Sequence, residues 1–511
     1  MNRPEIVIGL VGAVGTDMQP VCNALNLVLT EIGYSHSEIR LSQFLKDLPF
    51  PLSTPLVESP YEDRLNAYMS AGNEWRRKTK SGDALALLAI GRIREERAEA
   101  SQESAPEPAP KNSHAFILRS LKHSKEVETL RETYGPSFFL LSAYAPRQKR
   151  IETLTRQINA SHNHFRLEDY ESDAIRLINR DEAEAGDKFG QQVRETFWRG
   201  DAFVDVSDIT HLEGAIQRII QLWFGHPFHT PTRDEYLMFS AQAAAYRSAS
   251  LGRQVGAVIA TPDGSLISTG ANEVPSAGGG IYWHEDEPDA RDHVLGHDSS
   301  DSMRREMFAG IVQRLQDEEW LTENRRNLPV AELVKSLLDG DEAVMKGAEF
   351  MNLTEYQRPV HAEMTALTDA ARRGIPTQGC TLYCTTFPCH GCARHIVASG
   401  IMRVVYIEPY AKILARNLHA DAIRIEDNAS SDQRVRFTPF VGLAPSRYMD
   451  FFAMAKKKRK EPDGTVSKWQ PLEATPRLNG WSHYTTQYNE RIALAKLEEQ
   501  IPVETPEGET T

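Results

Sequence analysis

Apolar and polar positions change their period repeatedly along the N-terminal part of the chain, from the continuous runs of buried strands to the spacing of amphipathic helices. The first run, Glu5 to Leu10, is rich in Ile and Val and precedes a glycine-rich segment and a helical pattern. Further units of this kind predict strands over 115–118, 137–142 and 202–206, and helices over 20–29, 83–99, 124–134 and 212–224. Because strands that alternate with helices pair in one direction, this order predicts a parallel sheet.

A second domain is predicted after residues 225–232, which carry two prolines and no periodicity. The elements predicted there are a helix over 233–249 and strands over 256–260 and 266–270. About 90 residues then separate Asn272 from His361, more than a connection inside a compact domain needs, so an insertion is expected. We therefore divide the chain into a domain over 1–228, a domain over 229–455 with an insertion at about 276–355, and a basic and polar extension over 456–511.

The composition is that of a globular protein, since 41% of the 511 residues are hydrophobic and 25% are charged. The net charge of −13 disfavours a broad, sequence-independent grip on nucleic acid, although it is compatible with a local pocket for a small anion. The start of the chain lacks the pattern of a signal peptide, and no run approaches the roughly 18 apolar residues of a membrane helix. We expect a cytoplasmic protein without a membrane role.

Four of the five cysteines lie within residues 380–392, which favours a metal site in a reducing compartment over a disulfide framework. Two of them, Cys389 and Cys392, follow Pro388 at the spacing of a first helical turn. Together with the imidazole of His361, their thiolates supply three of the four tetrahedral positions of zinc and leave one for water, as a catalytic site requires. The predicted zinc ligands are His361, Cys389 and Cys392.

Glu363 follows His361 by two residues, on the first turn of a predicted helix, where it reaches a water at the fourth position without being a ligand. It can move protons from that water to a substrate ring and to a leaving amine, so it is the predicted general acid and base. A His-x-Glu motif followed by Pro-Cys-x-x-Cys is the signature of zinc nucleobase deaminases. The competing hypothesis, a four-thiolate structural site that adds Cys380 and Cys384, leaves the His-x-Glu motif without a purpose.

The stretches Val255–Ile259 and Gly270–Pro275 add to this signature, and residues 233–450 resemble the deoxycytidylate deaminase branch of the cytidine deaminase superfamily. The resemblance implies a three-layer α/β/α fold with a mixed five-stranded sheet. It also implies that Asn272 contacts the nucleotide sugar and that backbone groups near Ala362 and Cys389 bind the cytosine ring. A turn-forming role for Asn272 is the alternative.

Glycines mark the turn after the first predicted strand, where Gly9, Gly12, Gly15 and Thr16 resemble a phosphate-binding loop. Glycine amides and a helix start there would hold an anion. The glycines are spaced one residue too far apart for the phosphate loop of kinases, however, and Thr16 stands where its Lys is expected. The hypotheses are a degenerate kinase-like domain that binds a nucleotide, or a tight turn between a strand and a helix.

A P-loop kinase-like domain ahead of a deoxycytidylate deaminase makes the whole chain similar to the bacterial anti-phage dCTP deaminases. The supporting stretches are Tyr68–Asn73, Arg180–Glu182, Phe387–His390 and Ser446–Tyr448. This resemblance implies hydrolysis of dCTP to dUTP, and of dCMP to dUMP as a further activity, which would deplete dCTP as an antiviral defence. It also implies a restraint, either a nucleotide effector or an RNA or protein inhibitor, and we expect a homo-oligomer.

A triphosphate substrate requires cations, and the candidates are Arg253, Lys412, Arg416, Arg447 and the run 456–460. His284, His293 and His297 in the insertion are candidates for a second, structural zinc ion, with surface histidines as the alternative. Two other functions stay open. They are a cytosine deaminase acting on single-stranded DNA or RNA, which would grip a base with the insertion, and a regulatory protein with structural zinc.

Overall fold

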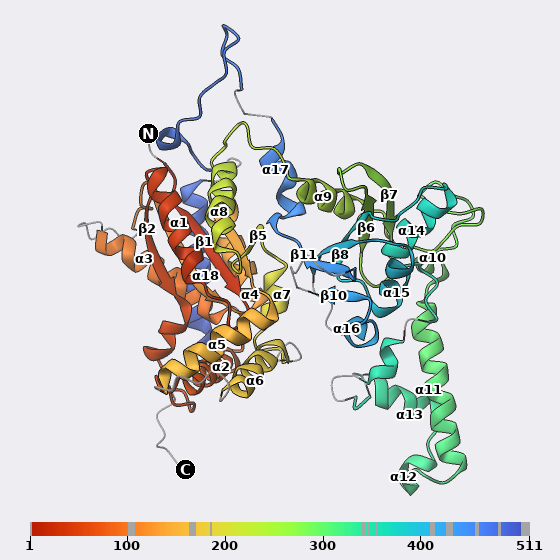
Figure 1. Ribbon diagram of the computed structural model, residues 1–511. Helices are drawn as coiled ribbons and strands as arrows, with labels where there is room; N and C mark the ends of the chain where they lie inside the picture. Colours follow the sequence, from red (N-terminus) through yellow and green to blue (C-terminus); the bar gives the residue numbers. More distant parts are fainter. Residues whose placement is uncertain are drawn as a thin grey trace, which may run out of the picture. The chain divides into compact units, whose positions relative to one another are not determined.

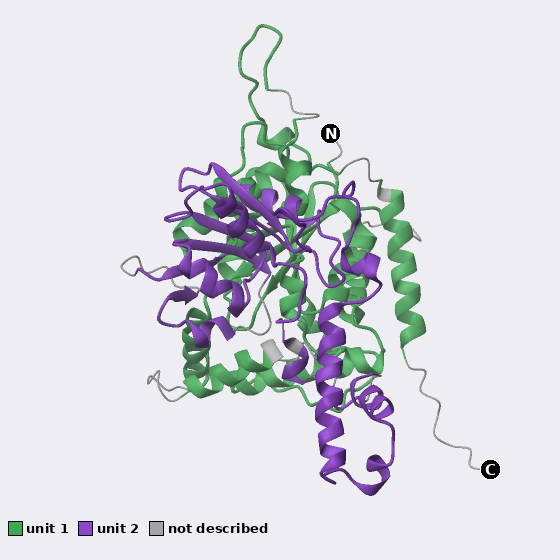
Figure 2. Ribbon diagram, turned by 90° about the vertical axis from the view of Figure 1, so that its right-hand side faces the viewer, with its two compact units in different colours: residues 1–236, 440–511 green, residues 237–439 purple. Residues whose placement is uncertain are grey.

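The computed structural model describes residues 3–100, 108–162, 170–183, 187–339, 343–345, 348–353, 355–408, 414–425, 433–454, 459–478 and 482–501. The chain divides into two compact units, coloured separately in Figure 2. Unit 1 consists of residues 1–236 and 440–511, and unit 2 of residues 237–439. The C-terminal segment therefore returns to the first unit.

A six-stranded sheet forms the centre of unit 1 within the described residues, with the strand order β12-β5-β4-β1-β3-β2 (Figure 1). The strands are β1 (Ile6–Gly12), β2 (Ser35–Arg40), β3 (His114–Leu121), β4 (Phe138–Tyr144), β5 (Ala202–Asp205) and β12 (Gly442–Leu443). Strands β1 to β5 are parallel, as the alternating pattern predicts, and only β12 runs antiparallel to its neighbour. The kinase-like fold of this unit stays a prediction.

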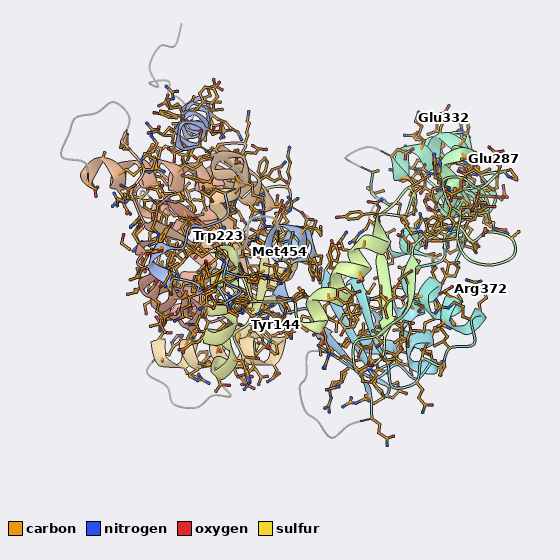
Figure 3. The ribbon with its side chains drawn as sticks, turned by 90° about the horizontal axis from the view of Figure 1, so that it is seen from above. Tyr144, Trp223, Glu287, Glu332, Arg372 and Met454 are labelled. Carbon is orange, nitrogen blue, oxygen red and sulfur yellow. The ribbon has the colours of Figure 1, made fainter. Side chains whose placement is uncertain are left out.

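Helices cover both faces of this sheet because the side chains of β1 alternate between two cores. Ile6, Ile8 and Leu10 pack against α1 (Gln19–Glu31) and α8 (Ile209–Trp223), in a core that includes Trp223, labelled in Figure 3. Val7 and Val11 face the opposite core, with α3 (Ala84–Ala100) and α4 (Ser124–Tyr134). The remaining helices of this half are α2 (Tyr61–Lys78), α5 (Arg147–Ser161), α6 (Glu171–Ala183) and α7 (Val193–Phe197).

Three described segments after residue 440 pack into unit 1. The short strand β12 pairs with β5, and α17 (Tyr448–Phe452) contacts α8. Within the predicted polar extension, α18 (His483–Gln500) packs on α3 and α4 and adds Ala493 and Leu497 to the second core. A few apolar positions on one side of an otherwise polar helix are enough for this packing, because the helix is stabilised when its apolar stripe is buried against a neighbouring surface.

Unit 2 contains a mixed sheet with the order β10-β11-β9-β8-β6-β7. Its strands are β6 (Gly256–Ala260), β7 (Leu266–Ala271), β8 (Thr381–Thr386), β9 (Arg403–Glu408), β10 (Ile423–Ile425) and β11 (Val435–Pro439). Strand β6 is antiparallel to both β7 and β8, whereas β8 to β11 run parallel. The described part of this sheet thus has six strands, so the expected number of five strands was one too low.

Two glycines allow helices to lie closely on opposite faces of this sheet. A Cβ atom on Gly256 would come within 1.9 Å of a backbone oxygen in α9 (Arg233–Ala245), and one on Gly270 within 2.1 Å of a backbone oxygen in α14 (Ala362–Arg372). Successive strand residues face opposite sides of a sheet, and Gly270 pairs with Ala257, the neighbour of Gly256. Helices α9 and α14 therefore form the outer layers of the predicted three-layer arrangement (Figure 1).

The described part of the insertion between β7 and α14 contains helices with a small core of their own. Its helices are α10 (Asp292–Leu295), α11 (Ser299–Asp317), α12 (Glu323–Arg326) and α13 (Val330–Leu338). Phe308 and Val312 of α11 pack against Leu333 and Leu338 of α13. Figure 3 shows Glu287 and Glu332 of this insertion at one end of unit 2. None of the helices in the described ranges combines the length and apolar character needed to cross a membrane.

Candidate metal centre

The three predicted zinc ligands come from the starts of two helices in unit 2. His361 is the residue immediately before α14, and Cys389 has the same position before α15 (His390–Ala398), which contains Cys392 in its first turn. The Cys389 sulfur accepts a hydrogen bond from the Cys392 amide, at 3.4 Å. A helix start presents such unpaired amides and favours negative charge, so the fold supports a thiolate at this point.

The ligand atoms converge at spacings that suit zinc. His361 Nδ1 lies 3.5 Å from the sulfur of Cys389 and 3.4 Å from that of Cys392. Bonds of about 2.0 Å from zinc to nitrogen and about 2.3 Å to sulfur place tetrahedral ligands roughly 3.5 Å apart. Among the residues that the structure describes, these three form the only group of His, Cys, Asp and Glu side chains able to hold a metal ion. The residues present therefore fit one zinc ion.

The thiols of Cys389 and Cys392 differ in their pKa. Hydrogen bonds with Cys392 and His361 lower the pKa of Cys389 to about 3, against the opposing effect of burial. The same hydrogen bond to Cys389, together with burial, raises the pKa of Cys392 well above its usual range. The hydrogen bond with Cys389 also raises the pKa of His361. These shifts favour the thiolate form of Cys389 and the protonated form of Cys392.

We expect Cys389 to be the reactive thiol of the zinc-free protein. Because its pKa is about 3, iodoacetamide should alkylate it at a nearly constant rate from about pH 8 to about pH 5. An ordinary thiol, with a pKa of about 8.5, would slow about tenfold per pH unit over that range. Mass spectrometry of digested protein measures the modification, Cys389→Ser is the control, and added zinc should protect the site. A tenfold loss of rate per pH unit would contradict the assignment.

Glu363 is 4% exposed and lies on the first turn of α14, beside the ligands. Burial raises the pKa of its carboxyl group, and the electrostatic interaction with His361 opposes this effect. A carboxylate with a raised pKa holds an accepted proton more readily than an exposed glutamate does, which suits the predicted acid and base role.

The two upstream cysteines have a different environment. Cys384 lies in β8 and Cys380 immediately before it, and both are buried in the apolar core of unit 2. Burial raises the pKa of both thiols, which disfavours the thiolate form that zinc requires. Neither belongs to the metal-binding group, so the structure does not assemble the four-thiolate site.

Asn272 uses its side chain within the protein. Its Oδ1 accepts from the Val255 amide at 2.7 Å, and its Nδ2 donates to the Arg253 carbonyl at 2.5 Å. A third bond joins the Asn272 amide to the Val255 carbonyl, at 3.1 Å. Asn272 thus braces the segment 253–255, and its contact with a sugar stays a prediction.

Arg253 lies in that braced segment and forms an ion pair with Glu408 and a 3.4 Å hydrogen bond to Thr386. These two partners end β9 and β8, the strand that leads to Cys389. The Arg253 side chain is 54% exposed, so it keeps a solvent-facing surface. Ala362 is fully buried in the core of unit 2, and a contact of its backbone with the cytosine ring stays a prediction.

The other predicted cations lie in separate parts of the chain. Arg447 belongs to unit 1, where it lies near Asp201 and Asp450. Arg416 is part of α16 (Leu414–Leu418). Lys412 and residues 456–458 lie outside the described residues.

Gln357 is a contact of the metal centre that sequence reasoning missed. Its Oε1 lies 2.8 Å from Nε2 of His361, the ring nitrogen opposite the one that faces the thiols. The only sequence sign of this contact is that Gln357 precedes His361 by four residues, which is not enough to distinguish it from an ordinary loop residue.

In the glycine-rich segment of unit 1, two of the backbone amides that could bind a phosphate donate hydrogen bonds to other groups of the protein instead. The Val14 amide donates to the buried Asp181 carboxylate at 2.8 Å, and the Thr16 amide donates to the Ala13 carbonyl at 3.0 Å. Gly15 has a φ of 86°, and a Cβ atom there would meet the Arg150 carbonyl at 2.7 Å. These contacts favour the alternative of a tight turn, whose backbone is held by the surrounding helices.

Gly9 and Gly12 occupy different places from those of a phosphate loop. Gly9 lies inside β1, where a Cβ atom would collide with Leu121 and Phe138, whereas Gly12 ends the strand. A cavity of about 360 Å³ opens beside Gly12, Gly15 and Thr16, with arginines from β2, β3 and α2 in its walls. This cavity lies outside the carboxyl end of β1, where open α/β sheets bind ligands. A nucleotide effector in unit 1 stays a prediction.

The three histidines of the insertion do not form a second centre among the residues described. His293 lies 3.8 Å from Asp289, and His297 lies 3.2 Å from the Leu295 carbonyl. Neither these residues nor His284 belongs to the single metal-binding group of the described chain.

Comparison with known proteins identifies the region that contains this centre. Residues 231–408 match the family model described as the cytidine and deoxycytidylate deaminase zinc-binding region. The deoxycytidylate deaminase of Enterobacteria phage T2 is 47% identical over 53 residues, and ComE operon protein 2 of Bacillus subtilis is 42% identical over 53 residues. Each alignment covers 10% of this chain and 28% of the relative, so the chain spans about a quarter of the length of these curated relatives.

Among solved structures, the dCMP deaminase of cyanophage S-TIM5, crystallised with dCMP and dUMP, is 17% identical, with a TM-score of 0.23. That alignment covers 42% of this chain and 100% of the phage chain. The family match includes all three ligands and Glu363, and the ligand geometry agrees with it. The C-terminal half of this protein therefore carries a zinc-binding domain of the cytidine and deoxycytidylate deaminase family, with zinc held by His361, Cys389 and Cys392.

Proposed function

We propose that this protein hydrolyses the 4-amino group of a free deoxycytidine nucleotide, converting dCTP to dUTP or dCMP to dUMP. The observation that carries the proposal is the buried carboxylate of Glu363 beside three convergent zinc ligands. A structural zinc site needs four protein ligands and no acid or base, whereas this centre has three ligands and one adjacent carboxylate.

Zinc bound by these ligands would supply a Lewis acid that lowers the pKa of a water molecule. Glu363 accepts a proton from that water and gives it to the ring nitrogen N3 of cytosine as the oxygen adds to C4. It then carries the second proton to the amino group, the bond between C4 and nitrogen breaks, and ammonia leaves. One water is consumed and one ammonia is released, so the reaction needs no other reactant.

The substrate class is supported by the relatives and by the positions of two polar residues. The curated matches at 47% identity over 53 residues are deoxycytidylate deaminases of phages T2 and T4. In this chain, Asn272 holds Arg253 on the segment before β6, and Arg253 has a solvent-facing guanidinium next to the ends of β8 and β9. We propose Arg253 as a phosphate contact and Asn272 as the residue that places it.

The test is to incubate the zinc-loaded protein separately with dCTP, dCMP, CTP and a single-stranded DNA, and to identify products by mass. We expect a gain of one mass unit, the replacement of an amino group by oxygen, in dCTP or dCMP. Uracil that appears only in the oligonucleotide would overturn the proposal in favour of nucleic-acid editing. No conversion of any substrate would contradict deaminase activity.

The biological role follows from the substrate. If dCTP is the preferred nucleotide, the activity would deplete the dCTP pool, as the resemblance to anti-phage deaminases implies. We propose this antiviral role on that condition, and dCTP concentrations in infected cells with and without the active protein test it.

A further inference from the structure

One hydrogen bond connects the insertion side of unit 2 to the outer nitrogen of a zinc ligand. His361 directs Nδ1 toward both thiols and Nε2 toward Gln357, whose Oε1 lies 2.8 Å away. When Nδ1 binds a metal it carries no proton, so the ring proton is on Nε2. That N–H can donate to the Gln357 carbonyl oxygen, and the observed distance is that of a normal hydrogen bond.

The segment that carries Gln357 is held in place at several points. The next residue, Arg358, donates to Asp292 at 2.7 Å and to the Ala290 carbonyl at 2.9 Å, both in the insertion. Val360 forms a backbone bridge with Glu273, at the end of the strand region before the insertion. Both contacts lie in the short stretch between Gln357 and His361, so the contact of Arg358 with the insertion restricts where Gln357 can go.

The ion pair that anchors Arg358 is partly protected from water. Asp292 is 5% exposed and begins α10, and Arg291 beside it forms a two-point pair with Asp289. The insertion thus presents a folded, ion-paired edge to residues 357–360. A loop held by such contacts loses less conformational freedom when its amide binds the imidazole, which makes the hydrogen bond more effective.

We propose that Gln357 is a positioning residue of the zinc centre, which fixes the tautomer and ring orientation of His361, and that the insertion holds the segment that carries it. The proposal concerns the zinc site on which the proposed function rests. Partners of the outer nitrogen of metal-binding histidines orient the ring, and their loss typically weakens metal affinity or activity by 10- to 100-fold. The insertion would then be required for zinc retention as well as for any contact with substrate.

The experiment measures zinc affinity in the full-length protein by competition with a chromophoric chelator. Gln357→Leu removes the acceptor with a similar side-chain size, and we expect zinc to bind about 10-fold or more weakly. Gln357→Glu retains a hydrogen-bond acceptor for Nε2 of His361. Its negative charge makes the imidazole more electron-rich and Nδ1 a better metal ligand, so the zinc affinity of this variant should equal or exceed that of the wild type. The matched control is Gln313→Leu, at an exposed glutamine of α11 in the same insertion.

A second readout separates positioning from folding. With cobalt in place of zinc, the visible absorption bands report the geometry of the ligands, and Gln357→Leu should shift or broaden them while circular dichroism stays unchanged. Arg358→Met should weaken zinc binding in the same direction through the loosened segment. Unchanged zinc affinity and cobalt spectrum in Gln357→Leu would overturn the proposal. If that variant does not fold, weaker zinc binding by Gln357→Glu would overturn it. Neither measurement uses a nucleotide, so a wrong substrate would leave both results interpretable.

Discussion

Glu363→Gln should abolish deamination while leaving the zinc centre and the fold in place. The substitution keeps the size of the side chain and removes the group that accepts and returns protons. General acid and base catalysis contributes roughly 10²- to 10⁴-fold, and Glu363 serves more than one proton transfer, so we expect a loss of kcat toward the upper end of this range. Single-turnover assays with the preferred nucleotide, at matched zinc content, measure the effect.

The pH dependence gives an independent check on the same carboxyl group. Burial raises the pKa of Glu363, and the group must be ionised to accept a proton. Activity should therefore fall as the pH decreases through this raised pKa, at a higher pH than for a solvent-exposed glutamate.

The control for Glu363→Gln is Asp369→Asn, a carboxylate-to-amide change on the same helix, where Asp369 pairs with Arg372 and Arg373 on the surface. If Glu363→Gln kept more than about a tenth of the wild-type kcat, the role assigned to Glu363 would be wrong.

The largest loss of stability is expected from Arg97→Met, in the helix that α18 covers. Arg97 is 1% exposed and lies between two carboxylates, 2.6 Å from Glu5 and 2.8 Å from Glu490 of α18. The substitution leaves both carboxylates without their shared partner in a buried site. Removing one member of a buried ion pair costs about 3–5 kcal/mol of unfolding free energy, and the second carboxylate adds to this cost.

Urea unfolding measures the effect through tryptophan fluorescence, because Trp75 and Trp223 are fully buried in unit 1. The matched control is Arg92→Met on the same helix, where the arginine pairs with exposed Glu95 and Glu99. Surface pairs of this kind contribute between 0 and about 1 kcal/mol, so the control should unfold close to the wild type. Equal urea midpoints for Arg97→Met and Arg92→Met would show that the buried network does not stabilise unit 1.

Several predicted elements agree closely with the structure, and the exceptions have physical reasons. The helix predicted over 83–99 is α3 (Ala84–Ala100), because its first half is a run of the strong helix formers Ala and Leu that is buried in a hydrophobic core. The edge strand β2 was not predicted, since five of its six residues are polar and only Ile39 is buried. Its strand conformation comes from pairing with β3, and a single sequence window does not contain that partner.

The sequence by itself determined the metal centre, because its chemistry depends on residue types at short spacings. His361 and Glu363 share one helix start and Cys389 and Cys392 share another, so each pair is placed by local geometry. The long connection between the two pairs matters little, because the sheet brings the helix starts together.

Only the tertiary structure decided the contacts between residues far apart in the chain. Asp181 binds the Val14 amide across 167 residues, and Glu490 binds Arg97 across 393. No local pattern distinguishes these carboxylates from the many that face solvent, since their role depends on which surface the folded chain places beside them. Gln357 and His361 are only four residues apart, but their hydrogen bond also depends on the tertiary structure, because contacts with the insertion hold the segment that carries Gln357.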